Sequence, residues 1–454
     1  MKNNIQIALI VIFIIATFTE YAKSQVDKSS YYYRGNKFYY NYFYQPVDKG
    51  DSLKVYTIYK IAYDLLKFTK LDENDLQERY VAYPEFEVHF QDEEGIIRKR
   101  DKRRDTIIVN DYKLINRVDI FYYGSVVSKL GYHEYTPYVY LWDEDMVKLG
   151  EKKLPQLDLT KMAASVGVSS PLISYASDES DTANIYPYIL DRNASFSSKD
   201  ILFYFLSFKN NPDLKYFSSI EFLDAGRTAI SWTGPSRINV EPEIINNKVV
   251  KFINKKHEEP VFKIIDGEPN DFGYKNIVKI RFTADRTAPG NYLLRVWNNQ
   301  NKDTVEFKFK IIWENIPISL RKPKYAAEIM YYVLTDDEYD EIKSGSDREI
   351  LSKIFKWWQK QDPTPFTLYN EAMTEYFRRV DYAFFNFKTI FEKDGAKSDR
   401  GKIYILYGAP DKVDTSMDTS GKTTEVWTYN KLKKKFYFLT DKNGIIYLKE
   451  IKNF

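Results

Sequence analysis

The stretch DPTPFTLYNEAMTEYFRRVDYA, residues 362–383, carries the densest folding signals in this chain. Pro363 and Pro365 fix their own backbone angles and keep the residues before them extended, so a preceding helix must stop there. Thr367 is a candidate N-cap for a new helix, and Glu371 falls in its first turns, where negative charge suits the helix dipole. One apolar stripe follows at helical spacing: Met373, Tyr376, Phe377, Val380, Phe384, Phe387 and Phe391. The stretch therefore predicts a long amphipathic helix.

The polar face of this predicted helix has two interpretations. Glu375 precedes Arg378 and Arg379 by three and four residues, which is the spacing of ion pairs on a helix. If these groups pair with one another, they only stabilise the fold. If they border a cleft, the carboxylates are candidate general acids or bases and the arginines candidate anion binders. The six candidate site residues are Asp362, Glu371, Arg378, Arg379, Asp399 and Arg400.

The neighbouring segments predict an α+β domain over residues 316–454. Upstream, residues 325–334 are helical in pattern, and Thr335 and Ser346 each begin a capping-box sequence. Downstream, four segments are rich in strand-forming residues: 402–407, 423–430, 434–440 and 444–451. Helices followed by an antiparallel sheet are typical of an α+β fold.

The first two thirds of the chain are predicted to be β-structure. Alternating apolar and polar residues with turn signals predict a β-sandwich-like domain over residues 25–160 and a second one over 200–315. Residues 161–199 are rich in Ser, Asp, Ala and Pro, and are interpreted as a linker or long loop. The fold class is therefore mostly β with a C-terminal α+β domain.

An aromatic segment, YYYRGNKFYYNYFY at residues 31–44, precedes the first predicted sandwich. One interpretation is an N-terminal strand or arm that packs on the domain after it. The other is an adhesive surface for sugar rings or a protein partner. Tyr is the most frequent aromatic residue in the whole chain, with 39 copies among 454 residues, and this abundance favours half-buried strands.

Charge and composition exclude some classes of protein. The net charge of +3 argues against a dedicated nucleic-acid binder, which needs a strong positive field. One basic run, residues 98–105, is interpreted as a solvated loop or hairpin tip, with contact to anionic glycans or lipid headgroups as the alternative. The chain has no cysteine, so disulfides, thiolate metal sites and a Cys nucleophile are absent. His89, His133 and His257 are isolated, and no cofactor or metal is predicted.

The N-terminus predicts export. Lys2 is followed by an apolar run at residues 5–18 and then by Ala22-Lys23-Ser24, which together form a signal-peptide pattern with cleavage before Gln25. The run is shorter than the ~20 apolar residues that a spanning helix needs. We therefore expect an exported protein in the periplasm or at the cell surface, with no transmembrane segment after cleavage.

Four ordered motifs in the C-terminal domain resemble the GWxTD-domain family of exported bacterial proteins. They are WWxxQDPTPxTxxNE at 357–371, EYFRRVxYA at 375–383, SDRGKIYILYGAPD at 398–411 and EVWTY at 425–429. The motif that names the family is altered, because Gly395-Ala396-Lys397-Ser398-Asp399 has Ala for Trp and Ser for Thr. The resemblance implies an exported protein and assigns no activity.

Three functional hypotheses follow. The first is a noncatalytic binding or assembly module of the cell envelope, whose partner is an envelope protein or a glycan. The second is a glycan-acting hydrolase that uses the carboxylates of the C-terminal domain, because paired carboxylates suit glycoside hydrolysis. The third is a carbohydrate-binding protein that uses its β-sandwiches. The sequence contains no nucleophile elbow, P-loop or dinucleotide fingerprint.

Overall fold

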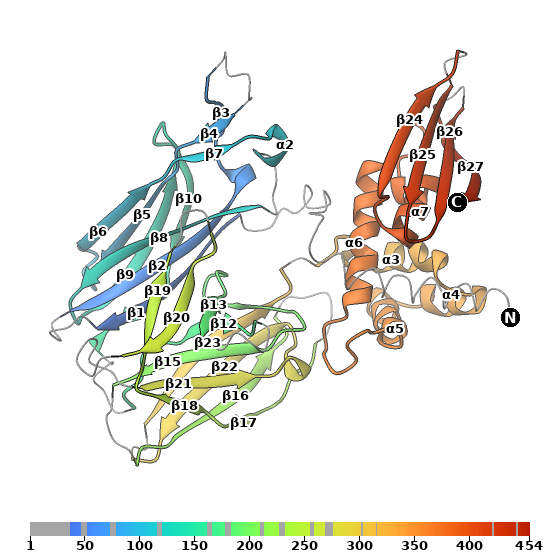
Figure 1. The fold of residues 1–454 in the computed structure, drawn as a ribbon. Helices are drawn as coiled ribbons and strands as arrows, with labels where there is room; N and C mark the ends of the chain where they lie inside the picture. Colours follow the sequence, from blue (N-terminus) through green and yellow to red (C-terminus); the bar gives the residue numbers. More distant parts are fainter. Residues whose placement is uncertain are drawn as a thin grey trace. The chain divides into compact units, whose positions relative to one another are not determined.

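The computed structural model forms two compact units (Figure 1). The β-rich unit comprises Tyr33–Arg227 and Ser231–Glu314, and the C-terminal unit comprises Asn315–Phe454. The structure describes residues 37–46, 52–72, 79–115, 120–160, 166–177, 183–208, 213–226, 232–254, 258–267, 276–300, 303–314, 316–419, 422–441 and 444–454. The predicted signal peptide, the first part of the aromatic segment and His257 lie outside the described residues. Among the helices described, none has the length and apolar character needed to cross a membrane.

The first strand-rich region contains two main sheets. A three-stranded sheet has the order β1-β2-β8, and its strands are β1 (Phe38–Pro46), β2 (Leu53–Ala62) and β8 (Phe121–Leu130). The facing sheet has the order β10-β9-β5-β6, with β5 (Glu85–Gln91), β6 (Ile97–Arg104), β9 (Glu134–Trp142), β10 (Lys148–Lys153) and, beside β9, β11 (Leu157–Asp158). A smaller sheet is built from β3 (Thr69–Lys70), β4 (Tyr80–Ala82) and β7 (Ile107–Val109), near η2 (Tyr63–Leu65) and α2 (Tyr112–Ile115). The interpretation of the basic run at residues 98–105 as a loop or hairpin tip is wrong, because residues 98–104 belong to strand β6, which pairs with β5.

The second strand-rich region also contains two sheets. The seven-stranded sheet, in the order β18-β21-β15-β12-β13-β20-β19, consists of β18 (Glu243–Asn246), β21 (Asn276–Phe282), β15 (Ile201–Ser207), β12 (Leu172–Tyr175), β13 (Asn184–Pro187), β20 (Val261–Asp266) and β19 (Lys248–Ile253). The five-stranded sheet, in the order β14-β23-β22-β16-β17, consists of β14 (Ala194–Ser195), β23 (Thr304–Ile312), β22 (Gly290–Asn298), β16 (Tyr216–Asp224) and β17 (Ile238–Val240). A short helix, η4 (Ala284–Arg286), precedes β22. The two sheets pack through aromatic pairs such as Phe203 and Phe309, whose ring centroids lie 5.0 Å apart.

The three-stranded sheet joins the two strand-rich regions into one unit, because both of its faces are buried. Tyr59 and Ile61 belong to a core with Phe86 of the facing sheet. Tyr56 and Ile58 belong to a different core with Phe262 of the seven-stranded sheet. Neighbouring residues of a strand point to opposite faces, so β2 contributes to both cores at once. The described part of the aromatic segment, β1, is confirmed as a buried N-terminal strand.

The interpretation of residues 161–199 as a linker is wrong for much of that segment. Leu172–Tyr175 and Asn184–Pro187 are strands of the seven-stranded sheet, and β14 lies beside β23. Leu172, Ile173 and Ile185 are buried, and this apolar burial outweighs the turn-rich composition between them. Residues 178–182 lie outside the described residues.

The C-terminal unit is α+β, as predicted. Its helices are η5 (Ser319–Arg321), α3 (Pro323–Ile329), η6 (Met330–Tyr332), α4 (Asp336–Lys343), α5 (Asp347–Gln359), α6 (Glu371–Asn386), η7 (Gly395–Lys397) and α7 (Asp399–Tyr407). The antiparallel sheet has the order β24-β25-β26-β27, with β24 (Lys412–Met417), β25 (Thr423–Tyr429), β26 (Lys434–Thr440) and β27 (Ile446–Asn453). Both predicted capping boxes are present, at Thr335 and at Ser346.

Two details of the central helix correct the prediction. The N-cap of α6 is Asn370, whose side chain accepts a hydrogen bond from the Met373 amide, and not Thr367. Thr367 instead donates to backbone carbonyls in the loop before the helix. The helix ends at Asn386, so both Phe387 and Phe391 of the predicted stripe lie beyond it; Phe387 is still buried, whereas Phe391 is 62% exposed.

Residues 402–407 were predicted as a strand and are the last six residues of α7. The Ser398 side chain caps this helix by accepting from the Gly401 amide at 3.0 Å. Gly408 ends it with a φ of 78°, a conformation that favours glycine. Ile403, Ile405 and Leu406 are buried. Local capping and packing therefore outweigh the strand propensity of this β-branched and aromatic segment.

Candidate functional site

The loop before α6 holds two of the predicted carboxylates. Glu371, the first residue of the helix, is buried and accepts a hydrogen bond of 2.5 Å from the Thr364 hydroxyl. Asp362 accepts from the backbone amide of Thr364 at 2.9 Å. Partial burial, together with the nearby charge of Glu371, raises the pKa of Asp362. Both carboxylates are thus joined to Thr364, and their contacts fix the turn that precedes the helix.

The two arginines of the polar face have different environments. Arg379 is buried, and its Nε donates to Glu375 at 2.7 Å. Gly408 lies against its guanidinium, because a Cβ on that glycine would lie 3.3 Å from Arg379 Cζ. Arg378 is 44% exposed, and its Nη1 lies 3.9 Å from the same Glu375. The predicted ion pairs are therefore present, with the close one made by the buried arginine.

The altered motif at residues 395–399 lies where α6 and α7 pack closely together, and we call these five residues the joint. A Cβ on Gly395 would lie 2.3 Å from the carbonyl oxygen of Ala383 in α6. A Cβ on Gly401 would lie 2.0 Å from the carbonyl oxygen of Gly395. Ser398 donates to that same carbonyl at 2.7 Å while it caps α7. Only glycine fits at the two contact positions, so these residues bring the two helices together.

The last two predicted residues connect α7 to the sheet. Asp399 accepts a hydrogen bond of 2.7 Å from the backbone amide of Leu448 in β27. Arg400 donates to Glu425 of β25 at 3.2 Å, and its guanidinium lies 5.3 Å from the centre of the Phe387 ring. Both contacts position the helix on the four-stranded sheet.

The structure does not bring the six predicted residues into one site. Asp362 and Glu371 meet at the start of α6, Arg378 and Arg379 share Glu375, and Asp399 and Arg400 contact the sheet. None of the six lines any of the three pockets described below. Their observed contacts are those of a structural network.

Comparison with protein families identifies this region. Residues 290–446 match the GWxTD domain. The chain contains a GWxTD domain. The match begins at β22 of the β-rich unit and ends at the start of β27. No curated protein matches the chain. The resemblance predicted from the four motifs is confirmed, and the naming motif of the GWxTD domain is the joint at residues 395–399.

A further polar group of the GWxTD domain escaped the sequence prediction. Asp381 of α6 is buried and accepts from the backbone amides of Ile318 at 2.6 Å and Ser319 at 2.9 Å. Burial raises its pKa to about 6, although these hydrogen bonds oppose the rise. The sequence signal that could have identified Asp381 as buried is its spacing. Asp381 lies four residues after the stripe residue Phe377 and therefore on the same face of the helix.

The GWxTD domain also has a pocket of about 350 Å³ beside the motif. Its lining includes Tyr331, Tyr332, Tyr339 and an ion pair of 2.6 Å between Lys397 and Glu328. The Tyr332 hydroxyl donates to the carbonyl of Ala396 at 3.0 Å. The charged pair is already satisfied, so this pocket offers mainly aromatic surface.

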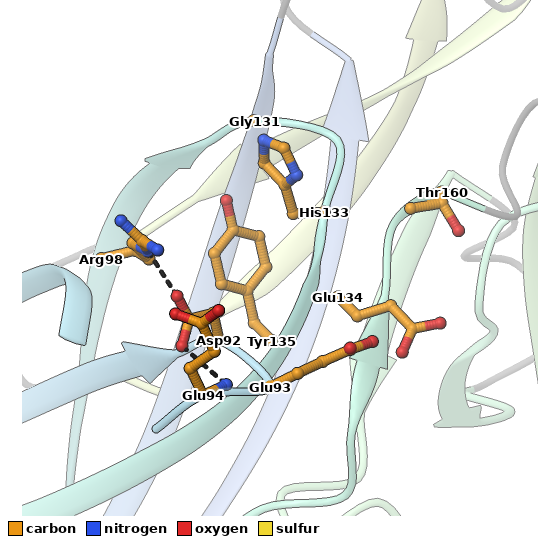
Figure 2. A pocket seen from close by; sticks show the side chains of 9 residues that line it. All are labelled: Asp92, Glu93, Glu94, Arg98, Gly131, His133, Glu134, Tyr135 and Thr160. Carbon is orange, nitrogen blue, oxygen red and sulfur yellow. Dashed lines mark hydrogen bonds and ion pairs between the residues drawn. The ribbon is translucent and has the colours of Figure 1, made fainter. Parts of the chain in front are cut away.

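The largest described pocket lies in the β-rich unit and is acidic (Figure 2). Its volume is about 860 Å³, and Glu93, Glu134 and His133 are among its lining residues. Figure 2 shows the carboxyl groups of Glu93 and Glu134 directed toward each other. The charge of Asp158, then burial and the Glu93 carboxyl, raise the pKa of Glu134. No set of three metal-ligating side chains occurs among the described residues, so this pocket gives no candidate metal site.

A smaller pocket of about 270 Å³ lies where the three-stranded and seven-stranded sheets meet. Its aromatic residues are Tyr123, Tyr175 and Tyr188, and its charged residues are Lys60, Lys199, Glu259 and Glu314. Lys60 and Glu314 form an ion pair of 3.0 Å. The sequence could not reveal this tyrosine pocket, because its residues come from separate segments spread between Lys60 and Glu314.

Glu259 is the most distinctive group of the tyrosine pocket. It accepts one long hydrogen bond of 3.4 Å from the Tyr175 hydroxyl. Burial raises its pKa, and the charges of Lys60 and Lys199 oppose the rise. A carboxylate can accept several hydrogen bonds, so Glu259 retains acceptor capacity toward the pocket.

Proposed function

We propose that this protein is an exported, noncatalytic binding protein of the cell envelope, and that it binds carbohydrate through the tyrosine pocket. The signal-peptide pattern at residues 1–24 supports export. The observation that carries the binding proposal is the half-buried carboxylate of Glu259, whose remaining acceptor capacity faces a pocket with aromatic walls. In this proposal the GWxTD domain serves as a structural or assembly module.

The chemistry of the pocket favours a neutral ligand that is rich in hydroxyl groups. Its four charged residues are two lysines and two glutamates, so their formal charges cancel. Lysine ammonium groups donate hydrogen bonds and carboxylates accept them, whereas a sugar hydroxyl can do both. Tyrosine adds an apolar ring face and a polar tip. The volume of about 270 Å³ suits one pyranose ring, since sites for drug-sized ligands begin at roughly 300 Å³.

Calorimetric titration of the purified protein with single sugars and envelope polysaccharides tests this proposal. We expect Glu259→Gln to weaken binding about tenfold, because a lost hydrogen bond to a charged group costs about 1.5 kcal/mol. Glu258→Gln is the matched control, since it makes the same change at the exposed neighbouring position. Equal affinities of both variants, or no binding of any sugar tested, would contradict the carbohydrate proposal.

Export is tested separately. Expression of the full chain in a bacterium with an intact export system, followed by fractionation, is expected to place the protein outside the cytoplasm. Sequencing of its N-terminus is expected to begin at Gln25. An intact Met1 on a cytoplasmic protein would overturn the export part and leave the sugar titration unaffected.

Glycan hydrolysis by the C-terminal carboxylates remains the alternative to binding alone. Its test is turnover of cell-wall or exopolysaccharide substrates by the purified protein and by Asp399→Asn. Because Asp399 holds β27, thermal unfolding of the variant must be measured alongside. Turnover by the native chain that disappears in a stably folded variant would establish the alternative.

A further inference from the structure

Strand β24 forms an open edge of the C-terminal sheet (Figure 1). It pairs with β25 on one side, and all six of its residues are exposed. An edge strand presents backbone N–H and C=O groups that can pair with another strand. Edges are commonly protected by charged side chains, by proline, by a bulge or by a covering segment. Strand β24 carries the charges of Lys412 and Asp414, but it has no proline and no bulge in its pairing with β25.

The side chains of β24 add apolar surface to this edge. Val413 is 50% exposed and Met417 is 71% exposed. Val413 is the direct neighbour of Trp427 in β25, and Trp427 is buried on the face where it contacts Phe387. Val413 and Met417 therefore lie on that same face of the sheet, since residues four apart in a strand share a face.

The sequence of β24 complements itself in one antiparallel register. When two identical strands pair antiparallel and symmetrically, a twofold axis passes beside one residue position. The residue at that position lies opposite the same residue of the second copy. With the axis at Thr415, Val413 faces Met417 of the second copy, and Asp414 faces Ser416. The same register places Lys412 opposite Asp418, so opposite charges meet at both ends.

The neighbouring symmetric registers are less favourable. An axis at Asp414 brings two carboxylates face to face, and an axis at Ser416 places Asp414 against Asp418. An axis at Val413 places Lys412 opposite Asp414 but puts Met417 opposite Ala409, which lies outside β24. Pro410 also limits the length of this register, because proline cannot donate to a ladder.

We propose that β24 pairs antiparallel with β24 of a second copy of this chain, with the twofold axis at Thr415. The two four-stranded sheets then become one continuous sheet of eight strands. The interface is isologous, and it uses main-chain hydrogen bonds, two Val413–Met417 contacts and two Lys412–Asp418 pairs. This self-association does not depend on the proposed sugar binding.

Cysteine cross-linking tests the register directly, because the natural chain contains no cysteine. In this arrangement the Thr415 Cα atoms lie about 5 Å apart, which is within the range that a disulfide spans. Thr415→Cys is expected to form the oxidised dimer about tenfold faster than Ser416→Cys, whose Cα atoms would be about 8 Å apart. Equal rates, or faster cross-linking by Val413→Cys, would overturn the register.

Substitutions that introduce charges at Val413 and Met417 test the same contact without a covalent bond. Sedimentation velocity of the native chain over a range of concentrations is expected to show a dimer. Val413→Lys with Met417→Lys should abolish it by placing like charges together, and Val413→Lys with Met417→Glu should restore it. Ile451→Lys on β27, 51% exposed, is the control and should leave the dimer intact. A native chain that stays monomeric, or a dimer that survives the paired lysines, would overturn the proposal.

Discussion

The polar residues at the joint of the GWxTD domain and those of the tyrosine pocket have similar chemistry but different partners. Asp399 accepts from the Leu448 amide and Arg400 donates to Glu425, so both help to position α7. In the tyrosine pocket, Glu259 has one long hydrogen bond and faces a cavity. The charged residues that stand out in the sequence of the GWxTD domain therefore make structural contacts. The stronger candidate for binding is formed by scattered residues that no motif connects.

The largest expected loss of stability comes from Gly401, which packs against Gly395 of the joint. Gly401→Ala places a methyl group 2.0 Å from the Gly395 carbonyl oxygen, which the backbone cannot tolerate without moving. We expect a loss of about 3 kcal/mol or more in the free energy of unfolding, at the upper end of overpacking effects. Gly131→Ala in the β-rich unit is the control, because its Cβ would lie 3.4 Å from His133. Chemical denaturation measures both, and a neutral Gly401→Ala would remove the distinction between the two regions.

The second-largest loss in the free energy of unfolding is expected at Asp381. Asp381→Ala leaves the buried amide of Ser319 and that of Ile318 without their acceptor, and we expect a loss of about 2 to 3 kcal/mol. Burial raises the pKa of Asp381 to about 6, so the folded state binds its proton more tightly than the unfolded state does. The contribution of this group to stability therefore falls as pH rises from about 4 to about 6. Denaturation at pH 4 and pH 7 should show that slope in the native chain and not in Asp381→Ala.

A smaller loss is expected at Asp399. Asp399→Ala removes the acceptor for the Leu448 amide and a negative charge from the first turn of α7. Its expected cost is about 1 to 2 kcal/mol, measured by denaturation. Ligand binding at the tyrosine pocket should not change. A variant with native stability and altered ligand affinity would instead make this residue part of a binding site.

The smallest change in stability is expected at Glu134, where the substitution should stabilise the protein instead of destabilising it. The charge of Asp158, with burial and Glu93, raises the pKa of Glu134, so its ionised form is disfavoured in the folded protein. Stability from this group is present at low pH and is lost as pH rises through the raised pKa. Glu134→Gln should therefore slightly raise the melting temperature at pH 7. Unchanged or lower stability at pH 7 would show that the contact between Gln156 and Glu134 outweighs the repulsion.

The sequence predicted features that local chemistry determines. The capping boxes at Thr335 and Ser346 were predictable because each uses residues three positions apart. The helical state of residues 402–407 was missed, because Ile and Tyr favour strands and their strand propensity was weighed above the caps at Ser398 and Gly408. The separation of the six candidate residues could not be inferred, since it depends on how α6, α7 and the sheet pack. The tyrosine pocket depends on contacts between distant strands.

The ion pair between Lys60 and Glu314 has a mechanical consequence. Glu314 is the last residue of the β-rich unit, and β23 ends two residues before it. A pull on the chain at Asn315 is transmitted along β23, which pairs with β22 over most of its length and with β14 at its final residues. The force then acts along these ladders and on the ion pair, so many hydrogen bonds share the load at once.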